Sequence, residues 1–320
     1  PSTTQESNRE AIFLSLVSNP TLQNLEIKDP CKTYIGKISD TVKSILNDLN
    51  ITKFKIDPTR NSYNFISRSR GGLDLITDLC RRSIPEDGDP GYFFYETQDV
   101  EGEGTRFNFK SIDNLIAEDP VETYTYTGGL KANLDNDEND FKIVREPNFI
   151  KDQNVQERKK WTSSRNIFFN PYDLVTDELV YTMKATSPKK TLGKKVTYTD
   201  EIKGYTTTHT HVLDLGSLGD INEITPNNDP REWQAKSPMR YNLLHSQLME
   251  IQVPCNLNLT AGNVIRVEFE RQGDNKSLGG IDEQTSGNFL ILHLCHHFDT
   301  SRSFTSMTLA RDTYGLYTRK

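Results

Sequence analysis

The sequence has few cysteines and no long apolar stretch, and both absences exclude whole classes of protein. The four cysteines lie far apart, and no C-x-x-C spacing occurs; they are Cys31, Cys80, Cys255 and Cys295. Neither a zinc knuckle nor a redox motif is therefore indicated, and we favour reduced cysteines in a protein folded in the cytoplasm. No apolar run approaches the ~20 residues of a membrane helix, and residues 11–17 lack the layout of a signal peptide.

Basic residues are outnumbered by acidic ones. The chain has 45 Asp and Glu against 38 Lys and Arg, which gives a formal net charge of −7. Affinity for phosphates depends on Lys and Arg, so such a chain is a poor general binder of DNA. Hydrophobic residues are also scarce at 34%, whereas Tyr and Phe are plentiful at 13 and 15. This mixture favours several thin β-layers over one large core.

Catalytic signatures are absent as well, since no G-x-S-x-G, P-loop or H-E-x-x-H motif occurs. Three acidic residues could be considered as the catalytic carboxylates of a glycosidase, namely Asp99, Glu101 and Glu103. Catalytic acids need fixed positions and apolar neighbours, which a Gly-rich loop tip does not provide. We therefore predict no catalytic residue and no enzymatic activity.

The run HLCHH is the best candidate for a metal site. On a strand, His293, Cys295 and His297 share one face, and His296 points to the other. Same-face neighbours are ~7 Å apart, too far to share one zinc ion without help. We favour a barrel strand with semi-polar side chains and predict no metal ligand.

Two further segments suggest ion binding, and a structural interpretation is preferred for both. Asp135, Asp137, Asn139 and Glu146 match positions of a calcium-binding loop, but Asp140 stands where that loop needs glycine. An acidic surface loop fits this segment better.

The second segment is Gly71-Gly72, which precedes a predicted helix beside Arg68 and Arg70 and so resembles an anion site. A flexible turn into an amphipathic helix is the preferred interpretation. No cofactor is predicted.

The first half of the chain predicts an α+β unit. Apolar residues at helical spacing predict a helix from Ile38 to Leu49 with Ser39 as its N-cap, and a second helix over 72–82. Two strands are expected between 53 and 66 around the Asp57-Pro58 turn, and a hairpin over 91–96 and 105–110. Residues 11–28 are expected to be strand, and 131–160 a polar surface segment.

The last third is the clearest β-region. Short apolar strands are predicted over 248–253, 264–269, 289–298 and 303–310, separated by Gly or Pro clusters. Residues 165–186 also predict strands, whereas 187–240 have few apolar anchors and predict a long excursion from the core.

Three stretches resemble the central hub subunit of contractile-tail phage baseplates of the T-even type. They are YIGKISDTVKSILNDL (34–49) with DPTRNSYNFI (57–66), LITDLCRRSIPEDGDPGYFFYETQD (75–99) with FNFKSIDNL (107–115), and VPCNLNLTAGNVIRVEF (253–269) with SGNFLILHLCHHFDTSRSFTSMTLARDTYG (286–315). The third has the strand order of the tail-tube barrel shared by tube proteins, hub proteins and type VI secretion spike proteins. Residues 131–160 and 187–240 match only loosely.

The resemblance implies a mainly β fold with α+β content, in which two tail-tube-like antiparallel β-barrels flank an α+β domain. Residues 1–30 would then be a remnant of the first barrel, whose earlier strands are absent from this chain, and 31–164 the α+β domain. Residues 165–186 and 241–312 would form the second barrel, with 187–240 inserted and 313–320 as a tail.

The same resemblance implies a function. Three subunits would form a homotrimeric ring that adapts the sixfold tail tube to the threefold central spike and leaves a channel for DNA. The implied partners are the central spike or tail lysozyme trimer, the tail tube initiator protein, the tape-measure protein and the baseplate wedge proteins. The location would be the virion tail, assembled in the host cytoplasm, with no membrane contact. A hub of a related injection or secretion machine is the first alternative, and a tail-associated cell-wall hydrolase the second.

A channel that lets DNA slide must not hold phosphates. We therefore predict an inner surface that is acidic or balanced, with the basic run at 187–195 outside it. That run contains Lys189, Lys190, Lys194 and Lys195, and Pro188 and Gly193 prevent it from being a regular barrel strand.

Overall fold

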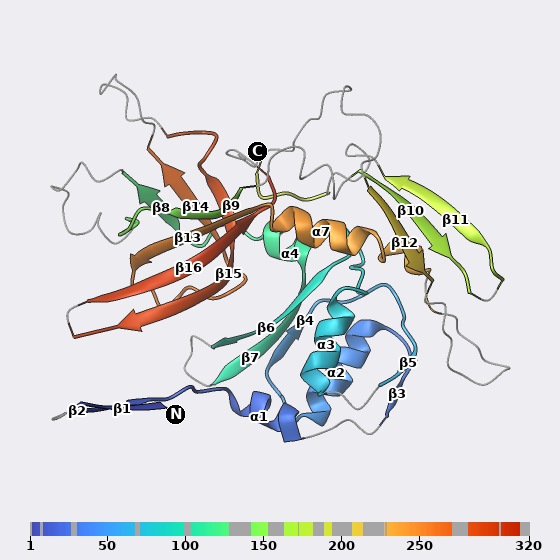
Figure 1. Ribbon diagram of the computed structural model, residues 1–320, viewed down its shortest axis with the longest axis horizontal. Coiled ribbons are helices and arrows are strands. Elements are labelled where there is room, and N and C mark those ends of the chain that lie inside the picture. Colours follow the sequence, from blue (N-terminus) through green and yellow to red (C-terminus); the bar gives the residue numbers. More distant parts are fainter. Residues whose placement is uncertain are drawn as a thin grey trace.

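The computed structural model describes residues 2–6, 9–26, 31–67, 71–98, 104–127, 142–152, 163–171, 173–181, 189–193, 207–213, 227, 229–270, 281–300 and 302–313. Within these ranges the fold is mainly β with an α+β part, as predicted. Figure 1 shows a large sheet and an α+β unit side by side, with helices α4 and α7 between them.

The α+β unit packs two helices on a small sheet. Helices α2 (Ile38–Asp48) and α3 (Gly72–Cys80) bury apolar residues against the sheet β4-β7-β6. Its strands are β4 (Phe54–Ile56), β6 (Tyr92–Gln98) and β7 (Thr105–Ser111). Strands β3 (Thr33–Tyr34) and β5 (Phe65–Ile66) pair beside it, and α4 (Ile112–Ala117) follows β7 directly. Ser111 caps α4 by accepting a hydrogen bond from the Asn114 amide at 3.2 Å.

Several local predictions are confirmed here, and one is wrong. Both helices form where apolar spacing predicts them, and β6 and β7 form the predicted hairpin. Ser39 is not the N-cap of α2, because the helix begins one residue earlier and Lys37 takes that position. The two strands predicted between 53 and 66 are present, and each pairs with a strand outside that segment, β4 with β7 and β5 with β3.

The four strands of the C-terminal third join β8 and β9 from the first half of the chain in a six-stranded sheet of order β8-β14-β15-β16-β13-β9. Its strands are β8 (Thr123–Tyr126), β9 (Asn148–Asp152), β13 (Gln247–Pro254), β14 (Val264–Phe269), β15 (Gly287–Phe298) and β16 (Ser303–Arg311). The four predicted C-terminal strands are thus present. Alternate residues along these strands pack into an apolar core, as Met249, Ile251 and Val253 do on β13.

The strand pairing differs from the expected second barrel. Strands β10 (Ser164–Phe169) and β11 (Thr176–Tyr181) pair with β12 (Thr207–Val212) in a separate sheet and not with the C-terminal strands. Their places at the edges of the six-stranded sheet are taken by β8 and β9, from the region assigned to the α+β domain. Packing determines which strands pair when they are far apart in sequence, and the local pattern of apolar residues does not specify it. The domain boundaries themselves stay a prediction.

The predicted excursion 187–240 contains regular structure within its described residues. It holds β12, the 3₁₀ turn η1 (Pro230–Glu232) and the start of α7 (Lys236–Leu244). The sequence of β12, TTHTHV, has one large apolar residue, so hydrophobic alternation could not predict it.

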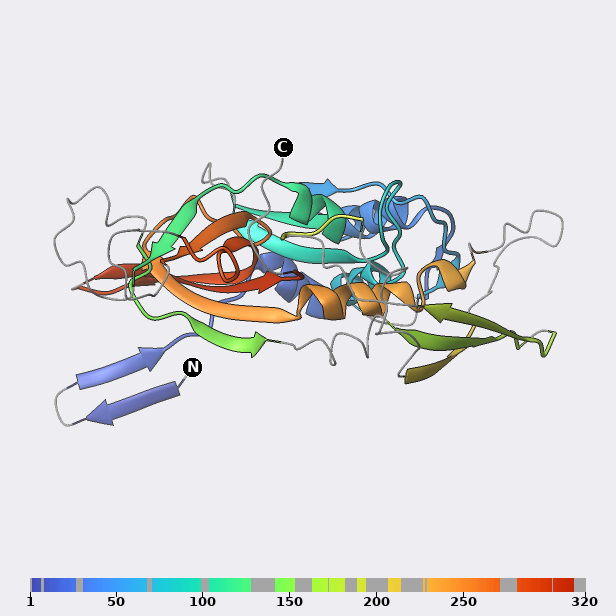
Figure 2. The same ribbon diagram turned by 90° about the horizontal axis from the view of Figure 1, so that it is seen from above.

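The N-terminal region forms a hairpin followed by a helix. Strands β1 (Ser2–Glu6) and β2 (Arg9–Phe13) pair antiparallel, and Figure 2 shows the hairpin lying away from the rest of the molecule. The strand expected over 11–28 therefore ends early, and α1 (Asn19–Glu26) follows. Pro20 in the first turn of α1 suits a helix start and not a central strand. No helix within the described ranges is long and apolar enough to cross a membrane.

Candidate functional site: a polar groove on the six-stranded sheet

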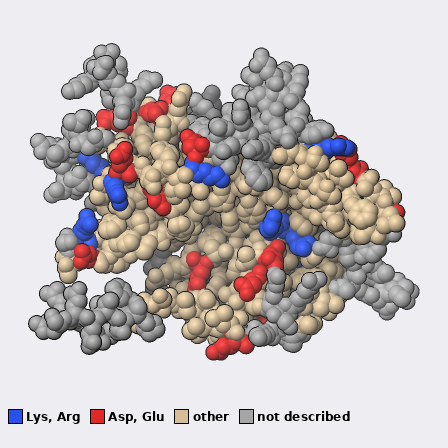
Figure 3. Space-filling view, in the orientation of Figure 1, with Lys and Arg blue, Asp and Glu red and all other residues tan. Residues whose placement is uncertain are grey.

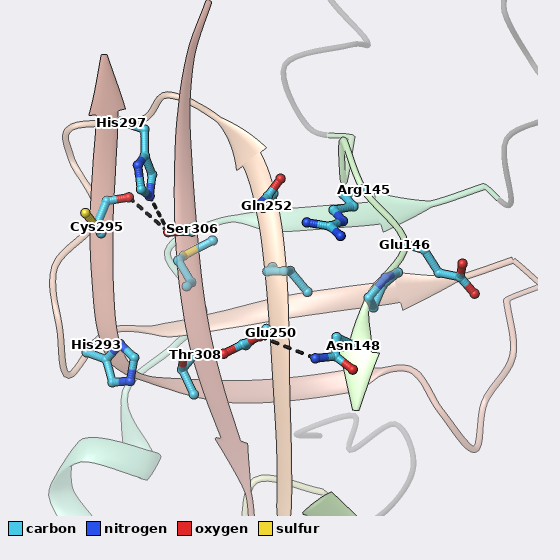
Figure 4. Close-up of a pocket in the computed structure, with 13 residues that line it drawn as sticks. Arg145, Glu146, Asn148, Glu250, Gln252, His293, Cys295, His297, Ser306 and Thr308 are labelled. Atoms are coloured by element: carbon cyan, nitrogen blue, oxygen red, sulfur yellow. Dashed lines mark hydrogen bonds between the residues drawn. The ribbon is translucent and has the colours of Figure 1, made fainter. Parts of the chain in front are cut away.

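A groove of about 890 Å³ runs across one face of the neighbouring strands β13, β16 and β15 (Figure 4). Because side chains alternate along a strand, the opposite face carries the apolar core, and this face carries polar residues. The register places them in two rows across the strands: Glu250, Thr308 and His293, then Gln252, Ser306 and Cys295. Arg145, Glu146 and Asn148 complete the rim beside β13.

The groove has no strong charge of either sign. Among its described lining residues, Arg145 is the cation, and Glu146 and Glu250 are the carboxylates. Figure 3 shows the same mixture over the face of the molecule seen in Figure 1, where blue and red side chains alternate within wide areas of other residues. A surface of this kind offers many weak hydrogen-bonding groups and no cluster of cations for phosphates.

The polar side chains of the groove bond to one another. His297 Nε2 lies 2.8 Å from Ser306 Oγ, and the His297 ring stacks on Phe304 at 4.5 Å between centroids. Asn148 Nδ2 donates to Glu250 Oε2 at 3.4 Å. On the opposite face, His296 Nδ1 lies 2.8 Å from Thr305 Oγ1, and burial lowers the pKa of His296.

The three residues considered as metal ligands lie on one face of a strand, as their two-residue spacing predicts. His293, Cys295 and His297 are exposed on one face of β15, and all three line the groove. In the part of the chain that is described, no three His, Cys, Asp or Glu side chains come together closely enough to hold a metal ion.

The other sequence candidates are spread apart or lie outside the described residues. Asp135, Asp137, Asn139 and Asp140 of the calcium-like loop are outside, as are Asp99, Glu101, Glu103, Arg68, Arg70, Pro188, Lys194 and Lys195. Glu146, the remaining member of the calcium-like loop, lies on the rim of the groove. At Gly71-Gly72, the amide of Leu73 donates to Asn24 Oδ1 at 2.9 Å, so a side chain of α1 already occupies the start of α3.

Sequence reasoning missed a buried ion cluster centred on Arg240 of α7. Its guanidinium donates to Asp113 Oδ1 at 2.9 Å and to Asp312 Oδ2 at 3.0 Å. The three side chains are 3%, 0% and 1% exposed, respectively. Burial acts to lower the pKa of Arg240, but the carboxylates of Asp312 and Asp113 raise it overall. Burial raises the pKa of Asp113, although Arg240 acts against it. Nothing in the sequence distinguishes these residues from surface charges.

No protein-family model matches this chain, and no curated protein matches it in sequence. Among solved structures, the tail protein from Neisseria meningitidis MC58 is similar with a TM-score of 0.52 and 12% identity, covering 90% of this chain and 71% of that one. The 43 kDa tail protein of prophage MuSo2 from Shewanella oneidensis has a TM-score of 0.48 and 9% identity, over 92% and 70% of the two chains.

A third similar structure is an Escherichia coli component of the type VI secretion system, described as structurally similar to T4 bacteriophage tail proteins. Its TM-score is 0.40 with 11% identity, over 94% of this chain and 55% of that one. Of these three structures, the Neisseria protein has a TM-score above 0.5, and this chain shares its fold.

Proposed function

We propose that this chain is a non-catalytic structural subunit of a contractile phage tail, and specifically the hub subunit of its baseplate. The fold shared with the tail protein from Neisseria meningitidis supports the general role. The residues that resemble hub subunits support the specific one, because the stretches 253–269 and 286–315 contain β14, β15 and β16 of the six-stranded sheet. In this role three copies form a ring between the sixfold tail tube and the threefold spike.

The groove is the observation that carries the proposal. A wall that DNA and the tape-measure protein slide past needs a polar surface without a cluster of cations, because each phosphate neutralised by Lys or Arg adds affinity. The face of β13, β16 and β15 meets this requirement, with Arg145 opposed by two carboxylates. We assign this face to the channel of the ring.

The basic run fits a position outside that channel. Neither Lys189 nor Lys190 lines the groove, and Lys189 Nζ instead pairs with Asp87 at 2.9 Å. In the proposed assembly this region faces outward, toward wedge components or solvent. The spike trimer and the tube initiator protein contact the two ends of the ring.

Electron microscopy of the purified particle tests the assembly. We expect density for this chain as a threefold ring at the tip of a contractile tail, between tube and spike. A full-length protein that stays monomeric at high concentration, or density at another position of the particle, would contradict the hub assignment. A tail attached to a capsid distinguishes a phage from a secretion machine.

Adding cations to the groove should convert a sliding surface into a binding one. In the assembled trimer, Gln252→Lys with Ser306→Lys should produce measurable affinity for duplex DNA, whereas the unchanged trimer should show none at physiological salt. Each phosphate contacted steepens the slope of log K against log salt by about 0.9. Fluorescence anisotropy over a salt series measures both effects.

The matched control adds the same charges elsewhere. Val121 and Leu257 are 49% and 62% exposed and do not line the groove, so Val121→Lys with Leu257→Lys adds equal charge outside it. Equal DNA affinity of the two variants would refute the assignment of the groove to the channel.

A further inference from the structure

A five-residue segment, 189–193, crosses the contact between helices α4 and α7 and the six-stranded sheet; we call it the strap. Leu192 of the strap is only 2% exposed. It belongs to an apolar cluster with residues of all the neighbouring elements: Ile112, Leu115 and Ile116 of α4, Leu244 of α7, and Val264, Leu290 and Ala310 of the sheet. We call this cluster the joint, because it joins the α+β unit to the sheet.

The backbone of the strap is bound at both ends. At its start, the Lys189 amide donates to Asp89 Oδ2 at 3.1 Å. At its end, the Leu192 amide donates to Asp312 Oδ1 at 3.0 Å and the Gly193 amide to Thr313 Oγ1 at 2.6 Å. Asp89 precedes β6, and Asp312 and Thr313 follow β16, so the strap bridges parts of the chain that are distant in sequence.

Both ends connect to the same buried guanidinium. Arg240 holds Asp312 Oδ2, while the other oxygen of that carboxylate takes the Leu192 amide. Arg240 also holds Asp113 Oδ1, and Asp113 Oδ2 accepts the Asp89 amide at 2.7 Å. A third contact is direct, since Arg240 Nη2 donates to the Lys190 carbonyl at 3.3 Å. The strap, the two carboxylates and Arg240 therefore form one closed network.

We propose that the strap is a conformational latch that locks the α+β unit against the six-stranded sheet. Its release removes Leu192 from the joint and takes the amide donor from Asp312 at the same time. A buried carboxylate that loses a partner and an apolar site that loses a side chain are both unfavourable, and here they occur together. The latch therefore closes or opens as a unit and controls whether the joint is rigid. This inference does not depend on the tail function.

A double-mutant cycle at the two ends of the strap tests this cooperativity. Leu192→Ala empties the joint, and Asp89→Ala removes the acceptor for Lys189 but keeps the Asp89 amide that Asp113 binds. If the strap acts as one latch, the first substitution detaches it, and the second then adds little further loss in the midpoint of urea unfolding. Contacts that act independently give additive losses, which would overturn the proposal. Leu192→Val replaces Leu192→Ala in the cycle if the alanine variant does not fold.

Hydrogen exchange locates the effect. Leu192→Ala should speed exchange of the Leu192 and Gly193 amides, and of α4 and α7, at least about tenfold, and leave α2 and α3 unchanged. Leu46→Ala, in the core of the α+β unit, is the cavity control and should act on α2 and α3 instead. Lys189→Ala removes only the exposed pair with Asp87 and should change nothing. If amide exchange became faster only in the strap, or equally throughout the chain, the strap would not be a latch.

Discussion

Replacing Arg240 by methionine should lower the free energy of unfolding by about 3–5 kcal/mol, the usual cost of removing one partner from a buried ion pair. Methionine fills a similar apolar volume but leaves Asp113 and Asp312 buried without their cation. Burial already raises the pKa of Asp113, so loss of Arg240 should favour its protonated form further. Urea unfolding at neutral pH measures the loss.

The raised pKa of Asp113 determines how the stability of this variant depends on pH. When the pKa of an aspartate is higher in the folded protein than in the unfolded chain, the folded state binds the proton more tightly. The protein therefore becomes less stable as the pH rises from the unfolded pKa through the folded one. Arg240→Met should therefore regain stability in mild acid relative to the unchanged protein. Adding Asp113→Asn and Asp312→Asn should restore part of the loss at neutral pH.

A matched control is the surface pair of Arg60 and Glu232, joined at 2.8 Å with side chains that are 50% and 44% exposed. Arg60→Met should cost no more than about 1 kcal/mol. If Arg240→Met were equally mild, the buried ion cluster would stabilise the fold no more than an exposed ion pair does.

Replacing Gly262 by alanine should destabilise the protein by about 2–4 kcal/mol, through backbone strain and overpacking together. The φ angle of Gly262 is +88°, a conformation that L-residues rarely adopt. A Cβ at this position would lie 2.2 Å from Tyr95 Oη and 2.7 Å from its Cζ. Tyr95 belongs to β6, so the clash would push the α+β unit away from the sheet. Thermal and urea unfolding measure the effect.

A substitution at Gly36 distinguishes the effect of backbone strain from that of overpacking. Its φ of +108° is equally unfavourable for alanine, but a Cβ there would meet nothing within 4 Å. Gly36→Ala should therefore cost only the backbone part, about 1–2 kcal/mol. Tyr95→Leu should make Gly262→Ala less harmful than it is alone. Equal losses for Gly36→Ala and Gly262→Ala would show that Tyr95 leaves room for a side chain.

Local pattern in the sequence determined the regular elements with the strongest periodicity. Ile38, Val42, Ile45 and Leu46 recur at helical spacing, and all four are buried in α2. The polar face of β15 followed likewise from strand alternation, because His293, Cys295 and His297 are two residues apart. Elements of this kind are encoded by residues near one another in the chain.

Tertiary structure alone decided which strands pair and which charges are buried. β8 and β9 join the six-stranded sheet, while β10 and β11 pair with β12, because a strand's pattern does not specify its partner. Arg240, Asp113 and Asp312 come from positions up to 199 residues apart (312 − 113), and each alone looks like a surface charge. Only the folded chain excludes water from all three, and burial makes them the ion cluster that holds the strap.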